Sequence, residues 1–518
     1  MRNRKLLIFL AAYFLAIFLW LLFCYKQVQK ACLQAGHTAQ SRVLEVEPLW
    51  ESGTAERAEN GHFFFGNTEN EDGAEKEQAD REELFDKKSQ EDYAAQEQSA
   101  VPEESVAEKG TFSAAIRVVL LGSNGVYHDR ILLEAGGERL EIKADSPYFA
   151  ETDIIRVRVT GGADSKIQVV SLSKACGHPS YEGTLEIRRE EQGLVLINEV
   201  PVEEYVKGVL PSEMPSSYPL EALKAQAVCA RTYAEMRQEE KAYPQYDAAV
   251  DDSTACQVYR NLQTSGQGDR AVEETAGEVL RKEDGSFMEC YYYSTSCGRG
   301  TQLSVWHGGE TERPVLSKSK EETDEMNWEF FGFIGQKNAD DPEAEEAFYR
   351  WNYRCDVSDD KRIFDRCADR QRINDRLVFA QSREDGSELE IDGEHLGDIT
   401  EMSIAERQEG GVADCMKISC EKGDIYVWGE YNIRYVLAQG GEVSLQNDTT
   451  YQAKELMPSA FISLQSICNE GGNMVGYIVV GGGFGHGVGL SQNGAKHMAL
   501  AGNSYREILE RYYQGCII

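Results

Sequence analysis

Short runs of apolar residues, several of them alternating with polar ones, dominate the chain from Phe112 to about residue 198. Each run is a few residues long and ends at Gly, Asp or Ser, which is the pattern of short β-strands separated by turns. The clearest runs are 114–121, 138–142, 154–159, 167–172 and 194–197. The pattern predicts a β-rich part over about residues 111–198.

The spacing becomes helical in residues 200–235, which read VPVEEYVKGVLPSEMPSSYPLEALKAQAVCARTYAE. Pro219 suits the start of a helix, and small or apolar residues then recur at helical spacing, namely Leu223, Ala227, Ala230 and Ala234. A stripe of small side chains allows a helix to pack closely against its neighbours. We therefore expect an α+β fold, in which the β-rich part leads into a helix-bearing core.

Helical signals return toward the C-terminus. Within residues 399–437 the run GDIYVWGEYNIRYVL predicts a strand followed by a helix. Further on, Ser491 is placed to cap a helix that Gly502 ends. Ser504 and Glu507 then have the spacing of a capping box for a last helix. The core is thus expected to continue to the end of the chain.

The N-terminal pattern predicts a membrane anchor. Residues 6–25 carry no charge and follow Arg2, Arg4 and Lys5. A stretch of that length crosses the core of a bilayer, and the positive flank favours a cytoplasmic N-terminus. No A-x-A-like cleavage site follows, which favours an uncleaved anchor over a signal peptide. We expect residues 1–30 to form a cytoplasmic tip and transmembrane anchor, with the rest of a single-pass protein outside the cytoplasm.

An acidic segment separates this anchor from the folded part. Residues 69–109 hold 15 Asp or Glu against five Lys or Arg, and few large apolar side chains. Such a composition buries too little surface to offset the entropy lost on folding. Residues 31–110 are therefore expected to be an acidic disordered linker.

Charge and cysteine content exclude some classes of function. The formal net charge of the 518 residues is −35, and binding a polyanion requires a basic face, so we expect no nucleic acid partner. There are thirteen cysteines but no CxxC pair, which argues against zinc ribbons and thioredoxin-like redox chemistry. We expect neither a metal nor another cofactor.

Glu213 is the carboxylate that the sequence singles out for chemistry. It lies in a Pro- and Ser-rich turn between two helical patterns, beside the apolar Val209, Leu210 and Met214. An apolar setting disfavours the charged form of a carboxyl group and raises its pKa toward neutrality, as a general acid requires. The alternative is a helix-entry carboxylate stabilised by the helix dipole.

His486 is the second candidate. Glycines flank it closely in the stretch GGGFGHGVGLSQNGAKHMA, so the backbone is able to come near a ring that exchanges protons. We expect it to line an active groove. A histidine that is merely hydrogen-bonded to its own loop is the alternative.

Two blocks of this sequence resemble the signature of the stage II sporulation protein D (SpoIID) family, which includes the LytB-type amidase enhancers. The first is Glu213-Met214-Pro215 followed by the helix 221–232, with Cys229 where the family usually has Ala. The second is the closing block 481–515. The resemblance covers about residues 111–518 and implies a core of the SpoIID type at about 199–319 and 396–518. Residues 320–395 look less like the family and are interpreted as an insertion with a small local core of its own.

The resemblance implies a membrane-anchored lytic transglycosylase that cleaves the glycan strands of peptidoglycan. In such an enzyme the hydroxymethyl oxygen of the muramic acid attacks its own anomeric carbon, so one carboxyl group, here Glu213, serves as acid and then as base. Substrate-binding roles are expected for Arg231, His486, Gln492 and Lys224, with Arg231 fixing an N-acetyl or lactyl group or orienting Glu213. A simple salt bridge is the alternative for Arg231.

The family comparison also bears on two cysteines. Some members have a Cys and a His before the position of Cys256, but this chain has Val250 and Ala255 there, and one cysteine is too few for a zinc site. Cys297 stands where the family more often has Gly. We take Cys256 and Cys297 as a possible disulfide.

Partners and rival functions follow from the same resemblance. The implied setting is sporulation or cell-wall remodelling, beside a cell-wall amidase and a further membrane partner. A non-catalytic, glycan-binding enhancer of an amidase is the main alternative. A cysteine hydrolase that uses Cys256 or Cys297 with His486 is a third, although no familiar nucleophile motif surrounds either cysteine.

Overall fold

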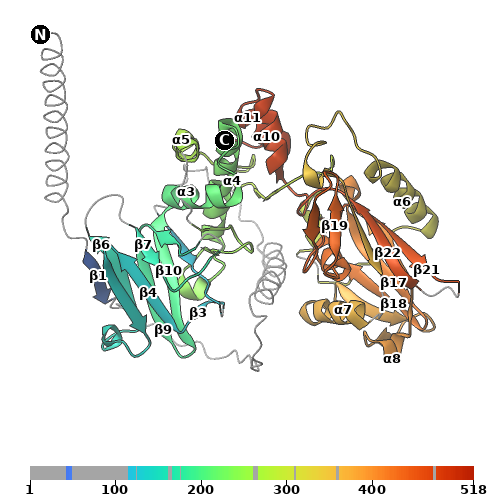
Figure 1. The fold of residues 1–518 in the computed structure, drawn as a ribbon, viewed down its shortest axis with the longest axis horizontal. Helices are drawn as coiled ribbons and strands as arrows, with labels where there is room; N and C mark the ends of the chain where they lie inside the picture. The colour runs from blue at the N-terminus through green and yellow to red at the C-terminus, as the bar shows by residue number, and fades with distance from the viewer. Residues whose placement is uncertain are drawn as a thin grey trace, which may run out of the picture. The chain divides into compact units, whose positions relative to one another are not determined.

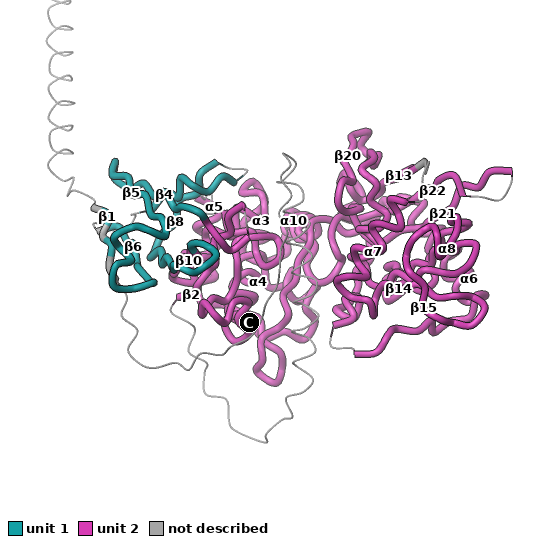
Figure 2. The backbone as a smooth tube through the Cα atoms, turned by 90° about the horizontal axis from the view of Figure 1, so that it is seen from below, with its two compact units in different colours: residues 1–54, 129–194 teal, residues 55–128, 195–518 magenta. Residues whose placement is uncertain are grey.

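The structure, a computed structural model, describes residues 43–48, 115–123, 125–160, 166–174, 177–260, 266–308, 311–356, 361–470 and 474–518. It divides into two compact units, residues 1–54 with 129–194 and residues 55–128 with 195–518 (Figure 2). The predicted anchor, 6–25, and most of the predicted linker, 31–110, lie outside the described residues. Among the described helices, none has both the length and the apolar character needed to cross a bilayer.

The first unit consists mainly of antiparallel strands. In one group β6 pairs with both β1 and β9, and in the other the order is β5, β4, β7, β8. Its buried side chains, such as Ile131, Leu133, Ile155 and Val157, alternate with exposed or half-buried ones as the sequence predicted. The strands are β1 (Val43–Pro48), β4 (Arg130–Ala135), β5 (Glu138–Lys143), β6 (Ile154–Thr160), β7 (Ile167–Val169), β8 (Ser180–Tyr181) and β9 (Thr184–Glu190).

Strand β1 corrects part of the predicted linker. Val43–Pro48 reads VLEVEP, and it runs antiparallel to β6 with Val46 opposite Val157. The prediction rested on the acidic composition of residues 69–109 and overlooked this short alternating run. At least these six residues of the range 31–110 therefore belong to the folded part.

The second unit begins with strands that lead directly into two helices. β10 (Gly193–Pro201) runs antiparallel to β2 (Ala115–Val119), and β11 (Val250–Asp251) runs parallel to β2. Proline precedes each of the two helices that follow, α3 (Val202–Glu213) and α4 (Leu220–Glu239). The predicted stripe on α4 is buried. Smaller elements are β3 (Tyr127–His128), α5 (Gly266–Glu274) and β12 (Tyr292–Tyr293).

Two five-stranded sheets form the remainder of the second unit. One has the order β20-β19-β13-β22-β21 and the other β15-β14-β18-β17-β16. Their strands are β13 (Trp351–Asp356), β14 (Val378–Ser382), β15 (Glu388–Leu389), β16 (Ile399–Arg407), β17 (Ala413–Cys420), β18 (Gly423–Trp428), β19 (Glu442–Leu445), β20 (Thr450–Gln452), β21 (Ile462–Cys468) and β22 (Met474–Gly481). The helices among them are α6 (Lys320–Ile334), α7 (Lys361–Ile373), α8 (Gly393–Leu396) and α9 (Glu430–Leu437).

Residues 320–395 do not form the small local core of their own that the sequence suggested. β13 is the middle strand of its sheet, between β19 and β22, and β14 pairs with β18. Trp351 and Phe330 are 2% exposed and belong to cores shared with residues outside this range. Trp328 alone among the tryptophans of this range is exposed, at 76%. The described parts of this range therefore share their sheets and cores with the rest of the unit.

The chain ends against its own central helix. β23 (Leu490–Ser491) pairs in parallel with β12 and leads into α10 (Gln492–Leu500) and α11 (Tyr505–Tyr512), which lie beside α4 (Figure 1). The predicted caps are confirmed, since Ser491 Oγ accepts a hydrogen bond from Gly494 N and Ser504 with Glu507 forms a capping box. Two motifs almost 270 residues apart in sequence are thereby brought together.

Gly489 provides a test of the loop that precedes β23. Its φ is +74°, and an added Cβ would collide with the Tyr291 carbonyl. Gly489→Ala is expected to lower the free energy of unfolding by about 3 kcal/mol, because strain and overlap add. Gly502→Ala is the matched control: its φ is +94° but no atom lies within 4 Å of the new Cβ, so only about 1 kcal/mol of strain is expected. Urea unfolding measures both, and equal losses would contradict the close approach.

Candidate functional site

A cavity of about 400 Å³ contains Glu213 in its wall, at the C-terminal end of α3. Glu213 Oε1 accepts a hydrogen bond of 2.6 Å from Val258 N, and Gln492 Nε2 donates one of 3.1 Å to the carbonyl oxygen of Glu213. The Tyr292 hydroxyl hydrogen-bonds to the same carboxyl group. Two distant segments therefore contact the carboxyl group, and a third holds the main chain of the same residue.

The surroundings of Glu213 raise its pKa. Enclosure by protein raises the pKa of the carboxyl to about 7, and hydrogen bonds from Val258 and Tyr292 and the charge of Arg260 oppose that rise. The side chain keeps a partial exposure through the cavity. A carboxyl group with this pKa is able to donate a proton and later accept one near neutral pH. Glu213 thus lies in the enclosed setting that the sequence predicted for it, with a raised pKa.

His486 lies in the same cavity wall, on the loop between β22 and β23. Its ring centroid is 5.2 Å from that of Trp306 and 5.7 Å from that of Tyr293. Burial lowers the pKa of the imidazole to about 4, so the ring is neutral at pH 7. Nδ1 accepts a hydrogen bond from Val488 N in its own loop. The ring therefore lines the cavity, as the first interpretation of the sequence expects. It is also hydrogen-bonded to its own loop, as the alternative interpretation expects.

Aromatic rings make up much of the remaining wall. They come from α4, from the segment around β12, from a 3₁₀ turn at Leu303–Trp306, from α9 and from the glycine-rich loop. The residues are Tyr233, Tyr291, Tyr292, Tyr293, Trp306, Tyr431 and Phe484. Flat apolar rings with a few polar groups between them suit a ligand that has both apolar faces and hydroxyl or amide groups, as sugars do.

The structure removes Arg231 and Lys224 from the predicted binding residues. Arg231 is 1% exposed and donates to both carboxyl oxygens of Glu203, at 2.9 and 2.7 Å, and to two backbone carbonyls. Lys224 Nζ is 2.9 Å from Glu221 and 2.6 Å from Glu274. Neither residue lines the cavity. A salt bridge within the fold, the alternative considered for Arg231, is the role the structure gives it.

The cysteine pair is also corrected. Cys297 is a free thiol packed with Val305 and Phe330, whereas Cys256 packs against the apolar cluster around Tyr246, so the two are not bonded to each other. Burial raises the pKa of the Cys297 thiol to about 12, which disfavours it as a nucleophile. Cys256 does line the cavity, but Cys297 does not.

A second enclosed carboxyl group, that of Glu343, lies outside the cavity wall and holds residues that position the wall. Glu343 is 4% exposed, and Oε2 accepts hydrogen bonds from Ser296 N at 2.8 Å and Ser491 Oγ at 2.7 Å. Burial raises its pKa to about 8. Glu343 does not line the cavity, but it holds the residue that caps α10 and so fixes the start of the helix that carries Gln492.

Sequence reasoning missed two charged residues of the wall, Glu430 and Arg434. Both lie on α9, whose start follows Gly429 at a φ of +85°. Arg434 Nη1 donates to Glu430 Oε2 at 3.1 Å. The available signal was the i, i+4 spacing of the two charges in WGEYNIR, directly after a predicted strand.

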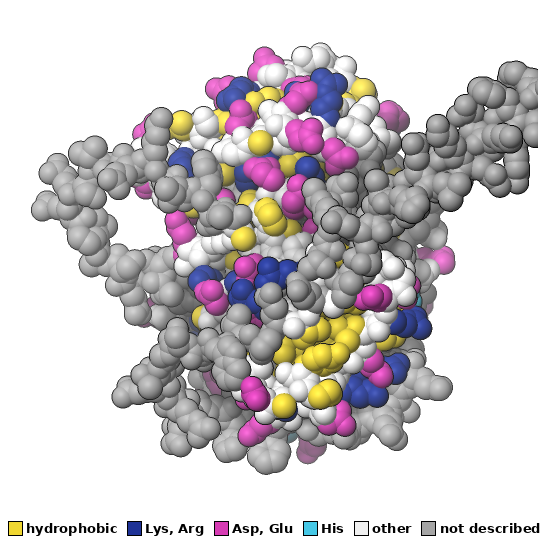
Figure 3. Space-filling model, turned by 90° about the vertical axis from the view of Figure 1, so that its left-hand side faces the viewer, with side chains coloured by type: hydrophobic (Ala, Val, Ile, Leu, Met, Phe, Trp, Pro, Cys, Tyr) yellow, Lys and Arg dark blue, Asp and Glu magenta, His cyan; other side chains and the backbone are white. Residues whose placement is uncertain are grey.

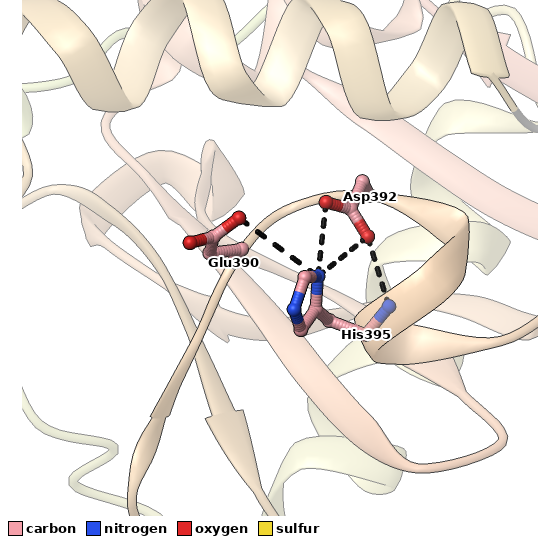
Figure 4. A group of neighbouring side chains, drawn as sticks. All are labelled: Glu390, Asp392 and His395. Carbon is pink, nitrogen blue, oxygen red and sulfur yellow. Dashed lines mark hydrogen bonds and ion pairs between the residues drawn. The ribbon is translucent and has the colours of Figure 1, made fainter.

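Outside the cavity, Glu390, Asp392 and His395 have side-chain atoms within 4.8 Å of one another (Figure 4). Asp392 accepts a hydrogen bond from His395 N at 2.8 Å as the cap of α8, and its carboxylate is 2.9 Å from Nδ1. Those hydrogen bonds lower the pKa of Asp392 and raise that of His395. The carboxylate is thus occupied by the helix cap, and we assign no metal to the group.

On the face drawn in Figure 3, lysine and arginine side chains are interspersed with aspartate and glutamate. No continuous basic field covers the described residues of that face. This distribution agrees with the net charge of −35 in disfavouring a polyanionic ligand there.

The fold and this cavity define an α+β protein with an enclosed acidic group in an aromatic-lined site. Comparison with known proteins then adds a family match. Residues 190–281, about a fifth of the chain, match the model of SpoIID, described as stage II sporulation protein, so this part of the chain is similar to that family. The match covers α3, α4 and the cavity residues between Glu213 and Val258.

Three proteins with similar sequences place this match in context. The chain is 28% identical to the amidase enhancer of Bacillus subtilis over 60% of this chain and 39% of that protein. It is 35% identical to stage II sporulation protein D of Bacillus amyloliquefaciens over 20% of this chain and 33% of that protein. An uncharacterized protein of Brachyspira hyodysenteriae is 26% identical over 65% of this chain and 71% of its own length. The chain thus spans well under half of the first two of these proteins, whose names refer to an amidase and to sporulation.

Proposed function

We propose that this protein is a lytic transglycosylase that cleaves the glycan strands of peptidoglycan. The observation that carries the proposal is the enclosed carboxyl group of Glu213, with a pKa of about 7, in an aromatic-lined cavity. Glu213 would donate its proton to the glycosidic oxygen as the bond from that oxygen to the anomeric carbon breaks. The hydroxymethyl oxygen of the same muramic acid then bonds to the anomeric carbon and returns its proton to the Glu213 carboxylate. The match of residues 190–281 to the SpoIID model supports this choice of substrate.

The other residues of the site have supporting roles in this proposal. Gln492 holds the main chain of Glu213 through its 3.1 Å hydrogen bond, and the neutral His486 forms part of the wall beside the sugar. A charged imidazolium in the same cavity would oppose the cationic character that develops at the anomeric carbon. Keeping the ring neutral at working pH therefore favours bond cleavage.

We further propose that residues 6–25 anchor the protein in the cell membrane, with the catalytic part outside the cytoplasm. The uncharged 20-residue stretch and the basic residues before it support this placement. The names of the relatives support a setting in sporulation or cell-wall remodelling, with a cell-wall amidase as a partner.

Product analysis tests the activity. Purified glycan strands incubated with the protein are expected to yield anhydro-muramoyl ends, which are lighter by one water than hydrolysed ends in mass spectrometry. Reducing muramic ends would instead indicate a hydrolase. Strands left intact, together with stimulation of a cell-wall amidase, would favour the non-catalytic enhancer, the alternative supported by the 28% identity to the amidase enhancer.

A further inference from the structure

The pair of Arg434 and Glu430 is a polar feature of the cavity that the reaction at Glu213 leaves unused. Their side chains are only 11% and 3% exposed, yet both residues line the cavity. Arg434 is held firmly: Nε donates to the Met457 carbonyl at 3.0 Å and Nη1 donates to Glu430 at 3.1 Å. The pair is therefore a preformed donor and acceptor at a fixed place in the wall.

The chemistry of the pair indicates which ligand group it fits. The guanidinium donates hydrogen bonds and the neighbouring carboxylate accepts them, while the two charges cancel. A secondary amide presents the complementary set, a carbonyl acceptor and an N–H donor, and brings no charge. A ligand carboxylate would place an uncompensated negative charge in this enclosed site, which is costly. A ligand ammonium group would lie beside the guanidinium and be repelled.

The neighbouring wall suits the rest of such a group. Leu456 precedes the residue that holds Arg434, and Leu456 and Phe484 both line the cavity. An apolar surface beside a donor and an acceptor matches a methyl group attached to an amide.

We propose that Arg434 and Glu430 form a subsite that recognises the acetamido group of an N-acetylated sugar. The amide carbonyl accepts from the guanidinium, the amide N–H donates to the Glu430 carboxylate, and the methyl group contacts the apolar wall. This assignment rests on the proposed function for the class of ligand, and it names the residues that select N-acetylated strands.

Binding measurements test the subsite separately from cleavage. Isothermal titration uses the full chain carrying Glu213→Gln, so that the ligands stay intact, with chitotetraose and its N-deacetylated form as probes. We expect at least about tenfold tighter binding of the acetylated form, since a site built to hydrogen-bond a group rejects an analogue without it. Arg434→Lys, which loses the planar fork, is expected to bring the ratio close to one.

Two further variants keep the test decisive. Glu430→Gln removes the compensating charge, so affinity should shift from the acetamido group toward a muramic sugar with a free lactyl carboxylate. Asp365→Asn breaks an exposed i, i+4 pair with Lys361 on α7, outside the cavity, and should leave the ratio unchanged. Thermal melting identifies any variant that fails to fold.

The outcomes separate this inference from the proposed function. An unchanged ratio in both Arg434→Lys and Glu430→Gln would overturn the subsite, even if the wild-type protein cleaves strands. If the ratio of the two affinities depends on the pair but the wild-type protein cleaves no strands, the subsite is supported and the proposed transglycosylase activity is excluded. If Arg434→Lys weakens only the binding of sugars with a free lactyl carboxylate, the pair is a carboxylate site instead and the proposal is overturned.

Discussion

Glu213→Gln is expected to lower the rate of strand cleavage by a factor of about 10² to 10⁴, the usual contribution of a positioned general acid. Glutamine keeps an oxygen that accepts from Val258 N, so the local geometry should be retained, but it has no proton to give. The measurement is the initial rate of release of anhydro-muramoyl ends from purified strands. Retention of more than a tenth of the wild-type rate would exclude Glu213 as the acid.

The pH dependence of the wild-type protein gives a second signature of the same group. The proposed reaction begins with the protonated carboxyl, whose pKa is about 7, so cleavage should fall tenfold per pH unit well above pH 7. The same group makes stability depend on pH. Because the pKa of the Glu213 carboxyl is higher in the folded protein than in the unfolded chain, its contribution to the stability of the wild type is lost as the pH rises through about 7, and the variant has no such group. Glu213→Gln should therefore melt no lower than the wild type at pH 8, which separates loss of catalysis from loss of folding.

Glu203→Ala is expected to lower the free energy of unfolding by about 3 kcal/mol. The change leaves the buried Arg231 guanidinium without its carboxylate partner, and Gly277 N also loses the oxygen that it donates to at 3.0 Å. Urea unfolding measures the loss. The affinity of the folded protein for glycan should stay unchanged, because neither residue lines the cavity.

The next residue on α3 supplies a matched control for this prediction. Glu204 forms an i, i+3 pair with Lys207 at 3.1 Å, and both side chains are partly exposed. Such pairs contribute little, so Glu204→Ala should cost less than about 1 kcal/mol. Equal losses in the two variants would contradict a special role for Arg231. Weaker glycan binding without a change in stability would restore Arg231 as a substrate residue.

The sequence predicted the parts of the site that depend on local pattern. Glu213 stands between two helix signals and beside apolar residues, and this local pattern was enough to single it out, although the residues that enclose it come from distant segments such as 254–258 and 290–294. His486 and Gln492 belong to one glycine-rich turn and the helix after it, and both do line the cavity. The α+β class followed in the same way from the change of spacing near residue 200.

The predictions from the sequence were wrong where contacts between residues far apart in the chain determine the structure. Arg231 lies on the same helix as other candidates, but its partner Glu203 precedes it by 28 residues, and no local pattern shows that a guanidinium will be enclosed. Glu430 and Arg434 join the site only because α9 packs near the glycine-rich loop, which the spacing of charges does not reveal. The role of residues 320–395 was missed for the same reason, since a central strand is defined by neighbours that come later in the chain.

The placement of β13 and Glu343 sets a limit on how this protein can be shortened. A chain cut down to the family-like core, residues 199–319 and 396–518, would lack the strand between β19 and β22 and leave Ser491 Oγ and Ser296 N without the carboxylate they now share. The start of α10 would lose its anchor, and with it the amide that holds Glu213. Domain dissection guided by family boundaries alone would thus give an inactive fragment, and its inactivity would carry no information about catalysis.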